Sequence, residues 1–288
     1  MAHILKGKDV VDRLNDELKK EVNALKAQGI TPTLGILRVG ERPDDLSYER
    51  GALKRCELIG VATQVTVLPE DVTEKEFFDT LDKLNKDSNI HGILMFRPLP
   101  KHINEQKARE ALLAAKDVDG CTDLSLAGVF TNTRLGFPPC TAEAAMEILK
   151  YYNIPVAGKK VAVIGRSLVI GRPVAMMLMH ENATVTICHT KTIDVPSITK
   201  AADIVVVASG QMESVGRDFV NEGQTIIDVG IGWNEEKGKL CGDVRFDEVE
   251  GVVDAITPVP GGVGGVTTSI LVKHVVEAAK RSLNHEQD

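Results

Sequence analysis

The chain has 288 residues, a hydrophobic content of 43%, a charged content of 26% and a net charge of −7. These values are ordinary for a globular protein with room for two modest domains. The acidic balance, without a basic cluster, argues against a nucleic-acid partner, and the longest apolar runs fall far short of the ~20 residues that span a bilayer.

The first part of the chain alternates between helix-like and strand-like segments. Apolar residues on one helical face predict a helix over 8–28, which Gly29 ends. Strands are then predicted at 33–39, 62–68 and 91–96, and helices at 45–59, 74–86 and about 104–114. Strands separated by helices of this length predict a parallel sheet covered on both faces.

A segment rich in Gly, Pro, Asp and Thr, 116–141, interrupts this alternation, and we interpret it as a functional loop region and a domain boundary. The alternation then resumes. Helices are predicted at 142–152, 171–181 and 267–283, strands at 159–165, 183–188, 202–209 and 224–230, and a Pro/Gly run covers 257–265. The fold class is therefore α/β, built in two domains.

The segment after the strand at 159–165 has the layout of a phosphate-binding turn. The strand ends at Gly165, Gly171 allows close approach of the backbone, and Pro173 lies in the first turn of the helix. Free amides and the partial positive charge of a helix N-terminus suit a pyrophosphate. The spacing G-x5-G meets the usual dinucleotide fingerprint only in part, so an ordinary strand–helix turn remains the alternative.

The end of the next strand favours NADP over NAD as the cofactor. An NAD site usually places an acid there for the ribose 2′-hydroxyl, whereas this chain has no acid until Asp194. Arg166, Thr190 and Lys191 could instead receive a 2′-phosphate. The alternative interpretation is a solvated basic turn.

Two further features concern the compartment and metals. The five cysteines lie singly, at positions 56, 121, 140, 188 and 241, without CxxC pairs. This pattern favours free thiols in a reducing compartment and predicts neither disulfides nor a metal site. Because the N-terminus becomes charged almost at once, we expect no signal peptide and a cytoplasmic protein.

Short motifs in a fixed order run through nearly the whole chain. They are VGERPDDLSYERG (39–51), HGILMFRPLPKHI (91–103), KDVDG (116–120), PPCT (138–141), IGRSLVIGRPVAMML (164–178), ATVTICHTKT (183–192), IIDVGI (226–231), GDV (242–244) and TPVPGGVGGVT (257–267). With these motifs the chain resembles the methylenetetrahydrofolate dehydrogenase/cyclohydrolase family.

The resemblance implies a folate-binding α/β domain from 1–141 plus 267–288, a Rossmann-like NADP-binding domain from 142–266, an active site in the cleft between them, and a homodimer. It implies tetrahydrofolate as the partner, as a substrate that carries a methylene group. By the same resemblance the cofactor-binding residues are Gly165, Arg166, Ser167, Gly171, Pro173, His189, Thr190 and Ile231. His189 is interpreted as a cofactor-side or structural residue rather than an acid or base.

Three features match the family's substrate site. Tyr48 matches the tyrosine that stacks on the folate, with half-buried packing as its alternative role. Asp119 matches the acid that receives two N–H bonds from the pterin, with an Asx-turn or helix cap as the alternative. Pro260, Gly261 and Gly262 match a loop that closely approaches folate and nicotinamide, with a plain connecting loop as the alternative.

Two positions depart from the family pattern. Ala52 stands where the catalytic lysine belongs, and Phe96 stands where a glutamine supports that lysine. Lys54 lies roughly 200° around the helix from Ala52, and Arg55 keeps its proton and cannot act as a base. On strand alternation, Arg97 should point away from Phe96.

We therefore expect a methylenetetrahydrofolate dehydrogenase that transfers hydride to NADP, with weak or absent methenyltetrahydrofolate cyclohydrolase activity. A fully bifunctional enzyme is the alternative within the family. A folate- or nucleotide-binding protein that regulates a partner without catalysis is an alternative of another class, and an NADP enzyme with a non-folate substrate is a third.

Overall fold

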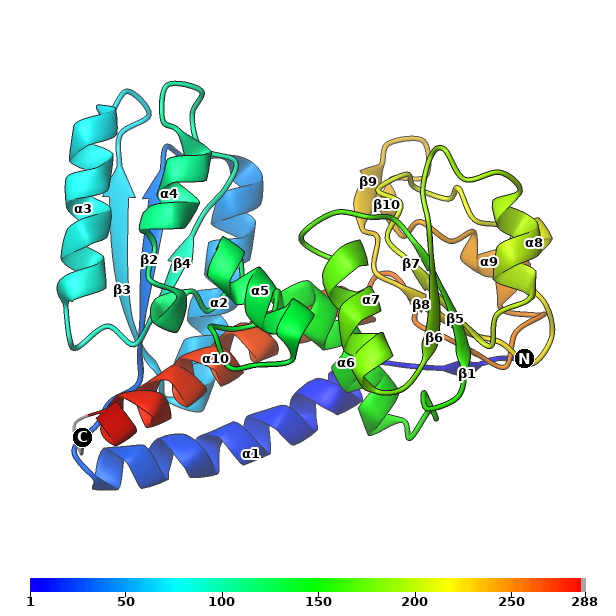
Figure 1. The fold of residues 1–288 in the computed structure, drawn as a ribbon, viewed down its shortest axis with the longest axis horizontal. Helices are drawn as coiled ribbons and strands as arrows, with labels where there is room; N and C mark the ends of the chain where they lie inside the picture. Colours follow the sequence, from blue (N-terminus) through cyan, green and yellow to red (C-terminus); the bar gives the residue numbers. More distant parts are fainter. Residues whose placement is uncertain (286–288) are drawn as a thin grey trace. The chain divides into compact units, whose positions relative to one another are not determined.

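The computed structural model describes residues 1–285, which divide into two compact units (Figure 1). Unit 1 comprises Met1–Asp12 and Thr141–Thr267, and unit 2 comprises Arg13–Cys140 and the chain from Thr268 onward. The motifs predict that all of 1–141 lies in one domain. The first residues belong to unit 1 instead because β1 (His3–Ile4) pairs in parallel with β11 (Ala255–Ile256), so sheet hydrogen bonds hold the chain start there.

Unit 2 contains a three-stranded parallel sheet in the order β3 (Ala62–Leu68), β2 (Thr33–Val39), β4 (Gly92–Met95). Its helices are α1 (Gly7–Ala27), α2 (Pro43–Ile59), α3 (Glu74–Lys86), α4 (Glu105–Ala111), α5 (Asp123–Thr131) and α10 (Val263–His285). Helices α1 and α10 begin in unit 1. Apolar side chains of β2 and β4 alternate between the faces, and Leu37, Ile93 and Met95 pack with α3 and α4 around Phe77 and Leu81.

Unit 1 contains a six-stranded parallel sheet in the order β1, β11, β8, β7, β5, β6. The strands not yet described are β5 (Lys160–Ile164), β6 (Thr184–Cys188), β7 (Ile204–Val207) and β8 (Thr225–Asp228). The helices of this unit are α6 (Cys140–Tyr151), α7 (Gly171–His180), α8 (Val195–Lys200) and α9 (Phe246–Val249). The central strands are continuous apolar runs, as expected for a sheet buried on both faces. This arrangement confirms the predicted Rossmann-like architecture.

The segment 116–141 is not the uniform loop that its composition predicted. It contains α5 (Asp123–Thr131), which the Thr122 hydroxyl caps by accepting a hydrogen bond from the Ser125 amide. Asn132 then ends the helix in the left-handed conformation. A nine-residue helix with a nearly even distribution of apolar residues shows no clear period, so the pattern alone could not reveal it.

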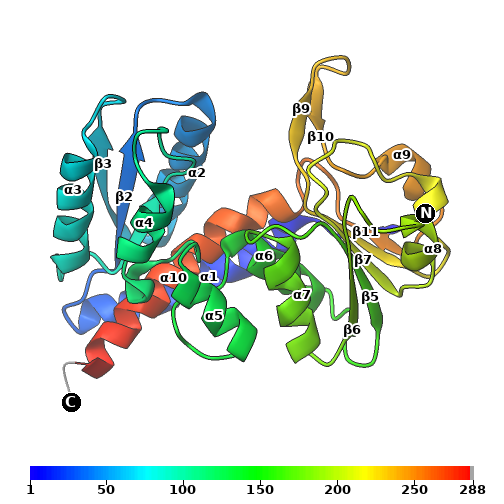
Figure 2. The ribbon, with the colours of Figure 1, turned by 45° about the horizontal axis from the view of Figure 1, so that its top comes forward.

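Smaller elements also escaped the sequence-based prediction. Two short 3₁₀ turns cover Ala114–Lys116 and Arg217–Phe219, and a hairpin of β9 (Gly232–Asn234) and β10 (Lys239–Cys241) projects from unit 1 (Figure 2). The last helix starts at Val263, inside the Pro/Gly run, rather than at 267. Within the described chain, no helix is both long and apolar enough to span a bilayer.

Candidate functional site

Helix α2 presents the motif tyrosine from a face that is anchored in the core. Asp45, Glu49 and Ala52 follow one another at helical spacing on its buried side. The Glu49 carboxylate receives a hydrogen bond from Arg38 Nε at 2.9 Å, and both side chains are almost wholly buried. Breaking such a pair is costly because it leaves a buried charge, so it fixes the rotation of α2 against β2.

Tyr48 lies four residues before Ala52, on the adjoining part of the same helix. Its ring meets the ring of Phe96 edge-on, with centroids 6.0 Å apart. The hydroxyl is buried and has no hydrogen-bond partner among the described residues. Burial, with the charges of Asp119 and Cys140, raises the pKa of this phenol, so it stays protonated. A buried O–H without a partner is unusual and marks a place for a ligand atom.

The two acids of the KDVDG motif have different surroundings. Asp117 is buried and accepts hydrogen bonds from the amides of Cys121 and Thr122 at 3.0 and 2.7 Å, and from the Ser125 hydroxyl at 2.6 Å. The turn-forming role considered for Asp119 therefore belongs to Asp117. Asp119 remains partly exposed.

The pKa of the Asp119 carboxyl is held above its ordinary value. Burial raises its pKa from 3.8 to about 6, and the negative charge of Asp117 adds to the rise. Arg97, a hydrogen bond from Cys140 and His274 act in the opposite direction. A desolvated carboxylate whose pKa stays raised despite these neighbours is suited to a ligand that brings its own N–H donors.

His274 and Cys140, which the sequence did not single out for this role, hold the Asp119 loop in place through the Val118 carbonyl oxygen. His274, buried on α10, has its Nδ1 2.7 Å from the Val118 carbonyl oxygen, and the Cys140 thiol donates to the same oxygen at 3.2 Å. The imidazole also lies 4.9 Å from the Phe137 ring, centroid to centroid. A histidine within the apolar face of the last helix is the signal that could have revealed this support.

The site offers no amine at the position of the family lysine. Ala52 has no exposed surface, and Phe96 is only 9% exposed. Lys54 lies on the exposed side of α2. Arg55 Nη1 donates to Asn15 Oδ1 on α1 at 3.0 Å, which directs that side chain toward α1. The expectation that neither neighbour replaces the lysine is consistent with these positions.

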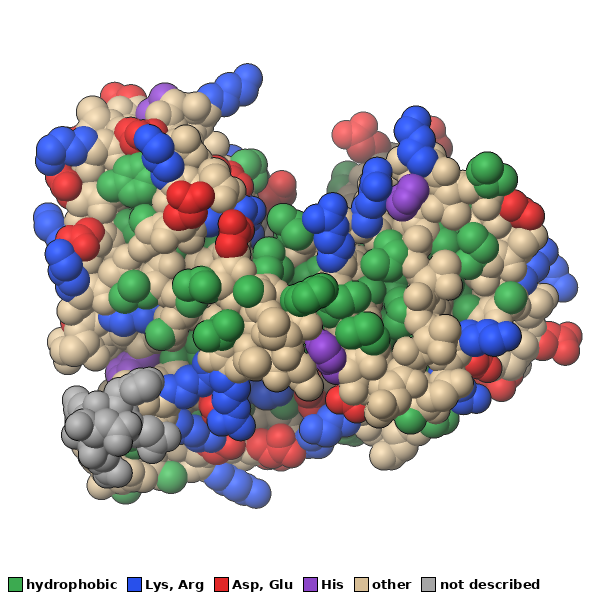
Figure 3. Space-filling view, in the orientation of Figure 1, with side chains coloured by type: hydrophobic (Ala, Val, Ile, Leu, Met, Phe, Trp, Pro, Cys, Tyr) green, Lys and Arg blue, Asp and Glu red, His purple; other side chains and the backbone are tan. Residues whose placement is uncertain are grey.

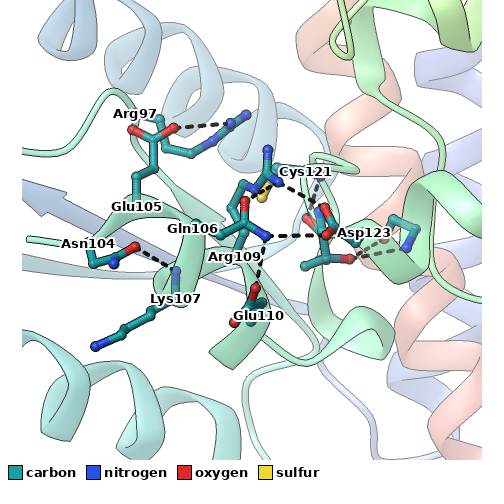
Figure 4. Close-up of polar contacts among 12 residues, drawn as sticks. Arg97, Asn104, Glu105, Gln106, Lys107, Arg109, Glu110, Cys121 and Asp123 are labelled. Atoms are coloured by element: carbon teal, nitrogen blue, oxygen red, sulfur yellow. Dashed lines mark hydrogen bonds and ion pairs between the residues drawn. The ribbon is translucent and has the colours of Figure 1, made fainter.

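Arg97 requires a correction. The alternation argument assumed that the strand continues through 96 and 97, but β4 ends at Met95, so strand alternation does not fix the direction of Arg97. Its charge is felt at Asp119, and one guanidinium nitrogen lies 3.8 Å from Glu105 at the start of α4 (Figure 4). The other end of α4 is tied to α5 by an Arg109–Asp123 ion pair of 2.8 Å (Figure 4).

The unit 1 sheet changes its winding direction at β5. From β5 the chain crosses to β6 on one side and then returns past β5 to β7 on the other. In open α/β sheets, ligands bind outside the carboxyl ends of strands at such a switch point. Gly165 directly follows β5, and Ala208 directly follows β7, so the motif glycine lies at this place.

The turn at Gly165 has no room for side chains. Gly165 has φ +121°, and an added Cβ would lie 2.2 Å from the Ala208 carbonyl oxygen. A Cβ on Gly171, the first residue of α7, would lie 2.2 Å from the Gly165 carbonyl oxygen. The glycines therefore fold the backbone tightly under the N-terminus of α7, a cradle suited to a pyrophosphate.

We expect Gly171→Ala to weaken NADP binding by at least roughly tenfold, because the backbone that must approach the phosphates has to move. Calorimetric titration with NADP measures the effect. Gly251→Ala is the matched control, since a Cβ there meets nothing within 4 Å. Equal NADP affinity in the two variants would contradict the assignment of this turn.

The other predicted cofactor residues occupy the same carboxyl edge. Arg166 and Ser167 follow β5, Thr190 lies exposed after β6, and Pro173 is buried in α7. The Arg172 amide donates to the Ser167 carbonyl oxygen, and the Ile170 amide donates to the Ser167 hydroxyl oxygen, which stabilises the turn. Figure 3 shows Lys, Arg and His side chains gathered over this edge of unit 1.

His189 organises the turn after β6. Its Nδ1 accepts a hydrogen bond from the Lys191 amide at 3.1 Å, and its own amide donates to the Thr192 hydroxyl at 2.9 Å. Asp194 caps α8 by accepting bonds from the amide and hydroxyl of Ser197. The first acid after β6 is thus engaged in a helix cap. Ile231, exposed, follows β8 at the same edge.

The Pro260-Gly261-Gly262 loop lies in unit 1, between β11 and α10. Gly261 has φ +102°, and its carbonyl oxygen accepts a hydrogen bond from the Gly7 amide at 2.8 Å. A Cβ on Gly262 would lie 2.5 Å from the Pro258 carbonyl oxygen. The glycines are therefore required by the loop's own geometry. Residues 1–285 contain no His, Cys, Asp and Glu group able to hold a metal ion.

Comparison with known proteins identifies the family. The profile "Tetrahydrofolate dehydrogenase/cyclohydrolase, catalytic domain" matches residues 5–119, and "Tetrahydrofolate dehydrogenase/cyclohydrolase, NAD(P)-binding domain" matches residues 139–283. The chain belongs to the tetrahydrofolate dehydrogenase/cyclohydrolase family. Its fold is the two-domain fold of that family, with a catalytic domain and a Rossmann-like NAD(P)-binding domain.

Relatives of high similarity carry bifunctional names. The chain is 53% identical to "Bifunctional protein FolD" of Carboxydothermus hydrogenoformans over 97% of this chain and 98% of the relative. Among solved structures, the bifunctional FolD of Campylobacter jejuni is 38% identical with a TM-score of 0.95, covering 98% and 100% of the two chains. The Trypanosoma brucei enzyme, solved with NADP and an inhibitor, is 35% identical with a TM-score of 0.91, covering 98% of each chain.

Proposed function

We propose that this chain is an NADP-dependent methylenetetrahydrofolate dehydrogenase. It takes a hydride from the carbon that bridges two nitrogens of reduced folate and leaves the methenyl cation. The observation that carries the proposal is the pairing, in one chain, of the Gly165–Gly171 phosphate cradle with the Tyr48 and Asp119 pair. Hydride transfer mainly requires two flat rings held face to face, and NADP, when bound, supplies the acceptor.

In the catalytic domain, Tyr48 and Asp119 would hold the pterin. The Tyr48 ring, braced by Phe96, offers a flat surface for stacking. Ionised Asp119 accepts two parallel N–H bonds from the amide-like edge of the pterin. The support of Val118 by His274 and Cys140 keeps that carboxylate in place.

In the NAD(P)-binding domain, exposed basic residues favour NADP. Arg166 and Lys191 stand at the carboxyl edge of β5 and β6, where a 2′-phosphate would lie. Asp194 caps α8, so we do not assign it to the ribose 2′-hydroxyl that an acid binds in an NAD site. The NADP complex of the Trypanosoma brucei relative supports the same preference.

The second step of the family is attack of water on the methenyl cation. The relatives are named as bifunctional enzymes. These names favour the alternative in which this chain performs both steps over a loss of cyclohydrolase activity. Ala52 and Phe96 are the specific observation for the loss, because hydrolysis needs a group that activates water and moves protons. On these residues we propose that hydrolysis is slow relative to hydride transfer.

The dehydrogenase proposal predicts that the purified protein forms NADPH when given methylenetetrahydrofolate and NADP. The measurement is the initial rate of NADPH absorbance, with NAD as the comparison cofactor. Folate binding without NADPH formation would instead support a non-catalytic regulatory protein. Absence of folate binding would favour a non-folate substrate. We also propose a homodimer, on the family resemblance alone, and a cytoplasmic location, on the pattern of single cysteines.

A further inference from the structure

A cavity of about 840 Å³ lies in unit 2, at the edge of the sheet opposite Phe96 and Arg97. Thr33 begins β2 in its wall, and His91 directly precedes β4. Because the strands are parallel and β2 has seven residues, this amino-terminal edge is about 20 Å along the sheet from the carboxyl edge near Phe96, although Lys116 in the cavity wall lies only three residues before Asp119. The volume is in the range of small-molecule sites.

The walls of this cavity combine cations with apolar side chains. Lys116, Arg134 and Arg281 line it together with His91, and no Asp or Glu of the described chain is among the lining residues. The apolar part consists of Ile30, Ile90, Leu124 and Leu135. Leu124 and Leu135 are at least half exposed, so the cavity offers an accessible apolar wall beside its cations.

The cations retain capacity for an anion. Among the described residues, Lys116 Nζ donates to the carbonyl oxygens of Leu84 and Asp87, at 3.3 and 2.6 Å. Its pKa is lowered, chiefly by burial, against a smaller rise from the Asp87 charge. Arg134 is exposed and has no ion pair within the part of the chain that the structure describes. A carbonyl-bound ammonium and a free guanidinium around one cavity favour a negatively charged occupant.

The two remaining basic residues shape the wall. Arg281 Nη1 donates to the Gly136 carbonyl oxygen at 2.9 Å, its Nε lies 3.4 Å from Glu277, and its guanidinium stacks on Phe137 at 4.2 Å. Its charge is thus partly matched. His91 Nδ1 accepts from the Thr33 amide at 3.2 Å, so the neutral ring carries its proton on Nε2 as a donor.

We propose that this cavity is a second ligand site, which binds a small organic phosphate or carboxylate that has an apolar body. Lys116 and Arg134 bind the anionic group, and the isoleucines and leucines cover the apolar body. No part of this proposal requires the dehydrogenase activity.

Contacts lead from the cavity to the Asp119 loop. Lys116 opens the KDVDG motif that ends in Asp119 and Gly120, and a Cβ on Gly120 would lie 2.4 Å from the Pro138 backbone. On the other wall, Gly136 precedes Phe137, whose ring contacts His274, the residue bonded to the Val118 carbonyl. If the proposed function holds, an occupant therefore alters the KM for the folate substrate.

The test uses phenyl phosphate, benzoate and neutral benzyl alcohol as probes. Each is titrated into the full isotope-labelled protein with saturating NADP, while backbone amide NMR shifts are followed. We expect saturable shifts at Thr31, Asn89 and Gly136 with the anions and none with benzyl alcohol. A stronger effect of phenyl phosphate than of benzoate would identify a phosphate as the preferred anion, and the reverse a carboxylate.

Lys116→Met and Arg134→Gln are each expected to weaken anion binding roughly tenfold. Lys20→Met is the matched control, an exposed lysine of α1 outside the cavity. Arg134→Gln keeps the test valid should Lys116→Met disturb the fold, because Arg134 is exposed. Shifts confined to unit 1, or unchanged affinity in Arg134→Gln, would overturn the site. Because binding is measured without turnover, a loss of enzyme activity does not change the outcome of this test.

Discussion

Asp119→Asn is expected to lower kcat/KM for methylenetetrahydrofolate by roughly 100-fold or more. Asparagine replaces one carboxylate oxygen with an NH2 group, which faces an N–H donor of the pterin. One charge-assisted hydrogen bond is therefore lost, and that pterin N–H is left without an acceptor. NADP binding, which belongs to unit 1, should not change. Initial rates with varied folate, together with an NADP titration, measure both effects.

The pH dependence of the same residue gives a second measure. Asp119 has a pKa raised to about 6, so kcat/KM should rise as the pH increases through about 6 and level off above it. A carboxyl whose pKa is raised by folding stabilises the protein below its unfolded pKa, and this contribution is lost as the pH rises through the folded pKa. From 3.8 to about 6 the loss amounts to at most about 3 kcal/mol.

Asp119→Asn removes this titration, so the unfolding free energy of the variant should lack the decrease between about pH 4 and 6. Denaturant unfolding at several pH values measures it. Asp71→Asn, an exposed acid outside the site, serves as the control. If Asp119→Asn kept the wild-type kcat/KM and its pH profile, Asp119 would not be the residue that binds the pterin.

Restoring the amine is expected to produce the largest gain of activity. The double variant Ala52→Lys with Phe96→Gln should raise the cyclohydrolase rate by roughly 100-fold, the usual scale of general acid–base assistance. Both changes are needed because Ala52 has no exposed surface and a lysine there must find room. Removing the Phe96 ring from the side of Tyr48 provides volume and a polar partner for the ammonium.

Ala52→Lys alone should destabilise the protein by about 1–3 kcal/mol through overpacking and should gain little activity. Lys54→Ala, on the exposed side of the same helix, is the control and should leave both rates unchanged. Thermal unfolding and the rate of methenyl absorbance decay measure these effects. A double variant that folds, binds folate and still gains no hydrolysis would argue that residues 52 and 96 do not limit the step.

The sequence predicted the parts of the fold that follow strong periodic patterns. The strands at 33–39 and 62–68 and the helix at 74–86 lie where expected: the strands are short runs rich in apolar and β-branched residues, and the structure shows that a capping box at Thr73 starts the helix at its predicted residue. The helix at 123–131 and the placement of the first twelve residues could not be predicted. The former lacks a period, and the latter depends on pairing between residues about 250 positions apart in the sequence.

In the candidate site, too, local motifs predict some residues, whereas others depend on contacts between distant parts of the sequence. The motifs predict substrate roles for Tyr48 and Asp119, but the different roles of Asp117 and Asp119 depend on which carboxylate faces the amides of the loop. The support from His274 depends on packing of a helix more than 150 residues away in the sequence. The alternation argument for Arg97 does not apply because the strand ends at Met95, a boundary that composition does not reveal.

The most direct test follows methylenetetrahydrofolate oxidation in a single preparation, with NADPH, the methenyl intermediate and 10-formyltetrahydrofolate measured together. We predict that NADPH and the methenyl compound rise in step while the formyl product lags. Formation of formyl product as fast as NADPH would contradict the proposed loss of hydrolysis and favour the bifunctional enzyme.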